Sequence, residues 1–155
     1  MTISEQTEMG ASAIDAFLGA QETGVLALRA DDSPEPYAIP ISYGYDAEQR
    51  CFYVRLVSTP DSEKRAFLAS SPRARLVVYS EEDPVYRSVI ATGTLEELDP
   101  ADLTPDQIEQ FGGAKRPLFE IWTENERELD IGLYQLRPTE LNGRRVEVER
   151  SDSSA

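Results

Sequence analysis

The sequence predicts a mainly β domain of the α+β class, either an antiparallel barrel or a strongly curled sheet, with short helices at its ends. Six short apolar runs alternate with turn-forming segments, which is typical of strands joined as hairpins. Most connections are too short to hold the crossover helix that a parallel sheet requires. The length of 155 residues suits one domain. We expect it to cover residues 1–149, with a disordered tail over residues 150–155.

The first half of the chain predicts one helix followed by three strands. Ile14, Phe17 and Leu18 lie at helical spacing, and Ser12 before them is a residue that can cap a helix. The three strands are expected at residues 25–29, 37–45 and 51–57. Pro40 lies within the second strand, where it cannot donate a ladder hydrogen bond. It therefore indicates an edge strand, a bulge, or a backbone that opens toward a ligand.

The second half predicts three strands and further short helices. Thr59 is expected to cap a helix that Pro72 ends, and Thr104 to cap another that finishes at two glycines. A last helix is expected at residues 117–128 from the helical spacing of its apolar side chains. The strands are expected at residues 75–79, 86–98 and 129–136. Gly93 predicts a bend in the long middle strand.

The charge balance of the chain is strongly acidic. It has 29 acidic and 15 basic residues, for a net charge of −14, and only Lys64 and Lys115 are lysines. This composition resembles that of proteins from halophilic archaea, in which carboxylates replace surface lysines; an ordinary acidic protein is the alternative. A chain of this charge repels phosphate backbones, so we expect no general nucleic-acid binding.

Several classes of protein are disfavoured by what the sequence lacks. There is no histidine, which excludes histidine-based catalytic triads and removes the commonest metal ligand, so we predict no metal site. Cys51 is the only cysteine, and it is most simply a small core residue. No apolar run approaches the roughly 20 residues of a membrane span, and the first residues do not resemble a secretion signal. We therefore expect a cytoplasmic protein without a membrane partner.

One basic segment stands out in this acidic chain. Residues 58–79 carry Asp61, Glu63, Lys64, Arg65, Arg73 and Arg75. A helix that opens at Thr59 would present backbone amides and partial positive charge to an anion. Ser62 and Lys64 would add donors there, as would Arg55 from the preceding strand. The segment thus predicts a phosphate or carboxylate site, unless Lys64 and Arg65 face solvent and pair with nearby carboxylates.

Four consecutive segments resemble the pyridoxamine 5′-phosphate oxidase-like superfamily of flavin-binding split barrels. They are GVLAL (24–28), PYAIPISYGYD (36–46), RCFYVRL (50–56) and DSEKRAFLASSPRARLVVY (61–79). The resemblance covers about residues 12–98 and is nearest to the short branch of nitroimidazole-resistance-like proteins. It implies a six-stranded antiparallel split β-barrel with short peripheral helices. It also implies a homodimer that holds FMN at its interface.

The resemblance also implies which residues hold the cofactor. Ser62 and Lys64 match a Ser-x-Lys motif at the flavin phosphate, and Arg65 is placed to substitute for a basic residue that Glu63 replaces. The remaining matched positions lie beside the flavin ring and are Pro40, Ile41, Ser42, Val54 and Arg55. Basic residues that flank the oxidase's second strand are replaced by Ala38 and Tyr43. The oxidase's substrate-binding segment has no clear counterpart.

The function that this resemblance implies is an FMN-dependent oxidoreductase that transfers hydride or electrons to or from a small molecule. Arg55 is the candidate for stabilising negative charge on the reduced ring, and no catalytic acid or base is assigned. Tyr43, Tyr45, Tyr53 and Tyr79 can donate protons, but tyrosines on strands are most simply packing residues. The alternatives are a non-catalytic flavin-binding or sensing protein and a deazaflavin (F420)-binding split barrel.

Overall fold

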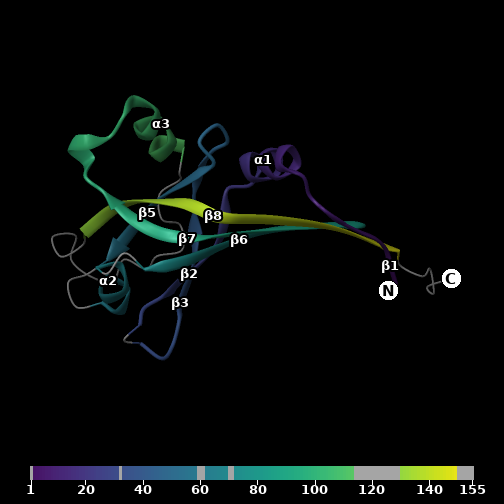
Figure 1. The fold of residues 1–155 in the computed structure, drawn as a ribbon, viewed down its shortest axis with the longest axis horizontal. Helices are drawn as coiled ribbons and strands as arrows, with labels where there is room; N and C mark the ends of the chain where they lie inside the picture. Colours follow the sequence, from purple (N-terminus) through teal and green to yellow (C-terminus); the bar gives the residue numbers. More distant parts are fainter. Residues whose placement is uncertain (1, 32, 59–61, 70–71, 114–129, 150–155) are drawn as a thin grey trace.

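The computed structural model describes residues 2–31, 33–58, 62–69, 72–113 and 130–149. It is mainly antiparallel β sheet with a few short helices, which confirms the predicted class (Figure 1). The strands are β1 (Thr2–Glu8), β2 (Thr23–Arg29), β3 (Tyr37–Ser42), β4 (Gly44–Asp46), β5 (Cys51–Ser58), β6 (Arg73–Glu82), β7 (Val85–Leu98) and β8 (Asp130–Glu149). The helices are α1 (Ala11–Ala20), α2 (Glu63–Leu68), the 3-10 helix η1 (Pro100–Asp102) and α3 (Pro105–Gly113).

The eight strands form one sheet, so the expected number of six is wrong. Their order is β3-β2-β6-β7-β8-β5-β4, and β1 pairs with β8 outside this path. The hydrogen-bonded order is open, but its two ends, β3 and β4, are separated in the chain only by Tyr43. The sheet therefore curls until both ends meet at that residue, which is consistent with a split-barrel-like fold.

Tyr43 divides the strand that was expected at residues 37–45. Its backbone N–H donates to the Glu22 carbonyl at 3.1 Å, and its hydroxyl donates to the Leu18 carbonyl at 2.8 Å. Its ring lies edge-on against Phe52, with 5.5 Å between centroids. These contacts bind the residue to the α1–β2 connection, so β3 ends there and β4 begins beyond it.

The barrel encloses one main apolar core. Alternate side chains of β2, β5, β6 and β7 point inward, as the two-residue period of a strand requires. Phe17 and Leu18 of α1 and Phe67 and Leu68 of α2 are buried in the same cluster. In Figure 1, α1 and α3 lie on one side of the long strands β7 and β8, and α2 lies on the other side beside β3.

The helix starts differ from the predictions in two places. The N-cap of α1 is Gly10, without a side-chain hydrogen bond, so the expected cap Ser12 lies inside the first turn. Ser62 caps α2, which ends at Leu68, before Pro72; the expected cap Thr59 lies outside the described residues. For α3, Thr104 caps as predicted: its Oγ1 accepts from the Gln107 N–H at 3.2 Å. The helix expected at 117–128 lies outside the described residues.

The last three strands are longer than predicted and run together as a ribbon. β8 has 20 residues and extends to Glu149, whereas the sequence predicted a strand that ends at residue 136. The expected irregularity at Gly93 is present as a register shift between β7 and β8. A Cβ at this position would lie 2.8 Å from the Arg137 carbonyl oxygen, so the close approach of the two strands requires glycine.

Candidate functional site

The first turn of α2 holds a buried lysine. Only 9% of Lys64 is exposed, and its Nζ donates to the Val57 carbonyl at 2.6 Å. The solvent-facing alternative for Lys64 is therefore not the arrangement in the structure. Ser62 Oγ accepts a hydrogen bond from the Arg65 N–H at 3.1 Å, which fixes the first turn of the helix around the lysine.

Other charged residues lie close to Lys64 in the sequence. Arg55 and Arg65 are half-buried, whereas Glu63 is exposed. Val54 and Leu56 point into the core, so alternation places Arg55 on the outside of the barrel. Because α2 has only six residues, its amides contribute less than a long helix would. The capacity for an anion therefore lies in the side chains Arg55, Ser62, Lys64 and Arg65.

The remaining candidates lie on β3 and on β5. Pro40 is exposed on β3, an end strand of the described sheet, so the edge interpretation of this proline fits the structure. Ile41 and Val54 are 3% and 1% exposed and belong to the core cluster. Ser42 is buried as well. A cofactor on the outside of the barrel would reach Ile41 and Val54 through their backbone atoms only.

The fold brings these three elements into contact. β3 contacts β5, and the Tyr37 ring of β3 lies 5.7 Å from the Phe67 ring of α2. The eight candidate residues thus lie on neighbouring elements at one part of the barrel. Pro40 and Arg55 lie on the outer faces of their strands, and Ser42 shares the face of Pro40, although its side chain is buried.

Three of the four candidate proton donors are structural tyrosines. Burial raises the pKa values of Tyr43 and Tyr45, and it raises the pKa of Tyr53 to about 12. These hydroxyls stay protonated at neutral pH, and each ring packs on an aromatic neighbour. Tyr79 differs because 59% of it is exposed. Cys51 is fully buried, as expected for a core residue, and burial raises the pKa of its thiol.

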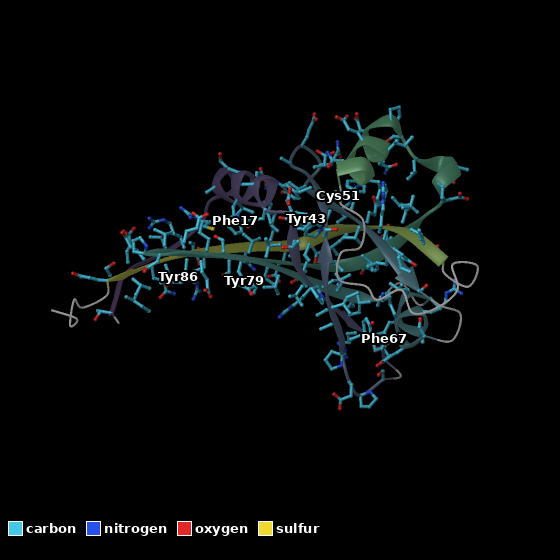
Figure 2. All side chains as sticks on the ribbon, turned by 180° about the vertical axis from the view of Figure 1, so that it is seen from behind. Phe17, Tyr43, Cys51, Phe67, Tyr79 and Tyr86 are labelled. Carbon is cyan, nitrogen blue, oxygen red and sulfur yellow. The ribbon has the colours of Figure 1, made fainter. Side chains whose placement is uncertain are left out.

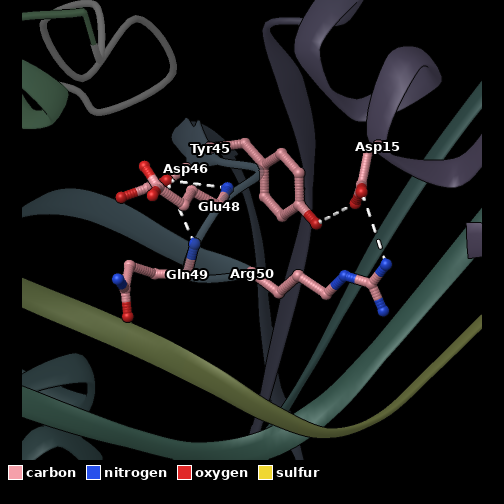
Figure 3. Close-up of polar contacts among 6 residues, drawn as sticks. All are labelled: Asp15, Tyr45, Asp46, Glu48, Gln49 and Arg50. Atoms are coloured by element: carbon pink, nitrogen blue, oxygen red, sulfur yellow. Dashed lines mark hydrogen bonds and ion pairs between the residues drawn. The ribbon is translucent and has the colours of Figure 1, made fainter. Parts of the chain in front are cut away.

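Figure 3 shows a polar network that the sequence did not reveal. The Tyr45 hydroxyl donates to Asp15 Oδ1 at 2.6 Å, and Arg50 lies 3.5 Å from the other carboxylate oxygen. Asp46 Oδ1 accepts from the backbone N–H groups of Glu48 and Gln49 and closes the turn before β5. The network joins α1 to the β4–β5 hairpin, and no spacing in the sequence indicates this contact.

Two other kinds of site were searched for in the described part of the chain. No group of three or more Cys, Asp or Glu side chains is arranged there to hold a metal ion. None of the described helices combines the length and the apolar character needed to cross a bilayer.

Comparison with known proteins gives a family and a fold. A family model described as pyridoxamine 5′-phosphate oxidase matches residues 10–145. An FAD-binding protein from Mesorhizobium loti superposes with a TM-score of 0.66 at 17% identity, covering 93% of this chain and 98% of that one. The FAD-binding protein from Mycobacterium smegmatis gives a TM-score of 0.63 at 15% identity, covering 92% and 100%. The comparison with curated proteins gave no match.

A third solved structure bears on the expected branch of the family. A protein from Bacteroides thetaiotaomicron, provisionally assigned to 5-nitroimidazole antibiotic resistance, has a TM-score of 0.61 at 12% identity. The match covers 92% of this chain and 88% of that protein. At these identities the likeness establishes only the shared fold. The structural neighbours with this fold include a nitroimidazole-resistance-like protein, as expected.

Proposed function

The chain belongs to the pyridoxamine 5′-phosphate oxidase family, and on this basis we propose that it is a cytoplasmic flavoprotein that binds FMN. We further propose that it is an oxidoreductase acting on a small molecule. Two structural neighbours are named as FAD-binding proteins, which supports a flavin as the class of cofactor. The observation that carries the proposal is the buried ammonium group of Lys64 between β5 and α2.

The donor set at this position suits a phosphate. Arginine, lysine and serine side chains are the usual partners of phosphate oxygens, and Arg55, Lys64 and Arg65 bring three positive charges within eleven residues of an acidic chain. Burial of Lys64 strengthens its interaction with an anion, because water screens the charge less. Glu63 is exposed beside it, so its carboxylate need not occupy the position of the anion.

We assign separate roles to the strand residues. Pro40, Ile41 and Ser42 of β3 and Val54 of β5 would form a wall for the flavin ring, with Ile41 and Val54 contributing backbone atoms. The flavin, when bound, supplies the transfer of hydride or electrons. Arg55 would place positive charge beside the ring and so favour its reduced, negatively charged form. Replacing Arg55 with glutamine should therefore lower the reduction potential of the flavin-loaded protein, whereas an unchanged potential would contradict this role.

We also propose that the protein is a homodimer with its cofactor at the interface. The sheet face on the far side from α1 carries Val77, Tyr79 and Ile90, of which Tyr79 is 59% and Ile90 37% exposed. Figure 2 shows Tyr79 on the opposite side of the ribbon from Phe17, and no described helix lies over it. An exposed apolar sheet face of this kind is typical of a surface that a partner covers.

A non-catalytic flavin-binding protein is the second candidate. One observation favours it: burial raises the pKa values of Tyr43, Tyr45 and Tyr53 and so makes them weaker proton donors, and the hydroxyls of Tyr43 and Tyr45 already donate to other residues. Anaerobic mixing of the flavin-loaded protein with NADH or NADPH separates the two functions. Rapid bleaching of the flavin absorbance supports an oxidoreductase, and a flavin that stays oxidised with both donors supports a binder.

The first experiment is to purify the protein and identify its cofactor. We expect a yellow protein that releases FMN when it is denatured, with FAD and the deazaflavin distinguished by mass. Lys64→Ala should then weaken FMN binding at least tenfold, because a hydrogen bond to a charged group is lost. Riboflavin lacks the phosphate, so its affinity should change little. Arg50→Ala, at an exposed arginine in the β4–β5 turn, is the matched control. A colourless protein that binds none of these flavins would overturn the proposed function.

A further inference from the structure

Three arginines lie together on the outer face of β2 and β6. Arg29 and Arg73 are directly opposite each other across the two strands, and Arg75 projects from the same face two residues further along β6. All three are exposed, and no carboxylate of the described residues forms an ion pair with them. Like charges opposite each other destabilise a sheet. The chain has 29 acidic residues, yet the three arginines do not neutralise neighbouring carboxylates of the described residues, so their grouping needs another explanation.

These arginines line a groove of about 330 Å³. The other residues that line it are Ala27, Leu28, Pro36, Ala74 and Thr92. Ala27 lies directly opposite Arg75, and its small side chain leaves space between the longer ones. The side chains of Leu28 and Ala74 are buried in the core, so these two residues contribute mainly backbone to the groove. The result is a small depression that three arginines line and whose floor is made of short side chains and backbone.

One of the three side chains is held in place by the sheet. Arg73 Nη1 donates to Thr94 Oγ1 of β7 at 3.3 Å. Thr92, two residues before it, lies directly opposite Arg75. Hydroxyl-bearing side chains on β7 thus lie next to arginines on β6, and both residue types donate hydrogen bonds to phosphate oxygens.

We propose that this groove binds a small polyanion through a phosphate or diphosphate group. The planar fork of a guanidinium pairs two N–H donors with two phosphate oxygens, and three arginines line this one volume. The volume lies at the small end of the range for small-molecule sites, which suits the charged end of a ligand. A bound anion would also offset the repulsion between Arg29 and Arg73. None of the three arginines belongs to the residues assigned above to the flavin.

The test is a calorimetric titration of the full chain with inorganic pyrophosphate at constant ionic strength. We expect one site per chain that depends on Arg73 and Arg75, separate from pyrophosphate that binds at the Lys64 position. Arg73→Gln and Arg75→Gln should each weaken binding at least tenfold, because each loses charge-assisted hydrogen bonds. The control Arg144→Gln removes the same charge from an exposed position on β8 and should weaken binding by less than twofold.

Competition identifies the source of the phosphate. If FMN displaces pyrophosphate from the site that depends on Arg73 and Arg75, and riboflavin does not, the groove holds the phosphate of the flavin itself. If pyrophosphate binds with equal affinity to protein loaded with FMN, the groove holds a separate phosphate-bearing molecule. Both results support the site, and the second does so even if the flavin assignment to Lys64 fails.

Three results would overturn the proposal. The first is no heat of binding with pyrophosphate for the unmodified protein. The second is an equal loss of affinity in Arg75→Gln and Arg144→Gln, which would show attraction to overall charge alone. The third is a change in self-association of Arg73→Gln without any change in pyrophosphate affinity, since the arginines would then pair with carboxylates of a second copy of the chain.

Discussion

At the scale of single residues, the Tyr45 hydroxyl makes the shortest bond of the network that joins α1 to the β4–β5 hairpin. It donates to Asp15 at 2.6 Å, and Asp15 also pairs with Arg50 (Figure 3). Tyr45→Phe should lower the free energy of unfolding by about 1.5 kcal/mol, the usual contribution of a hydrogen bond to a charged group. Urea denaturation measures this change. Tyr79→Phe is the control, since its ring is exposed, and should change stability by less than about 0.5 kcal/mol.

The buried hydroxyl of Tyr53 makes stability depend on alkaline pH. Its pKa is about 12 in the folded chain, against an ordinary value of 10.0. The folded state therefore holds this proton more tightly than the unfolded state does. The contribution to stability is fully present below pH 10 and is lost as the pH rises toward 12. Urea midpoints at increasing pH should fall less steeply for Tyr53→Phe than for the unmodified chain. Parallel curves would show that Tyr53 does not titrate in this range.

At the scale of elements, local signals in the sequence were sufficient wherever the cause of a structure is local. Thr104 and Gln107 form reciprocal bonds at the start of α3, as the spacing of a helix cap predicts. The break at Tyr43 could not be predicted, because the carbonyls that hold it belong to Leu18 and Glu22. β1 escaped prediction for a different reason: all of its side chains are exposed, so it has no apolar pattern.

Some features of the candidate site were likewise predictable from the sequence, and others depend on contacts between distant residues. The sequence placed Ser62 and Lys64 at the start of a helix, but it could not show that Lys64 turns inward to the Val57 carbonyl. It also grouped Arg73 and Arg75 as neighbours along one strand. Arg29 joins them only through the pairing of β2 with β6, and this register is a property of the folded sheet.

The contact between α3 and β4 depends on the absence of a side chain at Gly44. A Cβ there would lie 2.5 Å from the Gln110 carbonyl oxygen, so Gly44→Ala must displace the helix. We expect a loss of about 1–3 kcal/mol in the free energy of unfolding. We also expect faster labelling of the Cys51 thiol, because α3 covers this cysteine through Phe111.

The control for this change is Gly19→Ala in α1, where no atom lies within 4 Å of the added carbon. Alanine is the better helix former by about 1 kcal/mol, so stability should stay the same or rise. If Gly44→Ala leaves both stability and thiol labelling unchanged, α3 does not pack on β4 as described.

At the scale of the whole molecule, the chain combines a strongly acidic surface with an exposed apolar face of the sheet. The net charge of −14 disfavours the compact state through self-repulsion, and salt reduces this repulsion. The halophilic origin stays a prediction, and a midpoint of thermal unfolding that rises steadily up to molar KCl would support it. The apolar face of Val77, Tyr79 and Ile90 interrupts this charged surface. We propose that this face stays apolar because a second copy of the chain covers it.

Ile90→Asp should therefore weaken the dimer without unfolding the chain. Ile90 is 37% exposed, so an aspartate there reaches water in the monomer, but in the dimer it would place an unpaired charge between apolar side chains. Sedimentation equilibrium should show a dissociation constant at least tenfold higher. Ile108→Asp adds the same charge to an exposed position on α3, 57% accessible, and should leave the dimer intact. Equal dissociation constants in both variants would place the subunit contact on another surface, because an unpaired charge buried in an apolar interface must weaken the dimer.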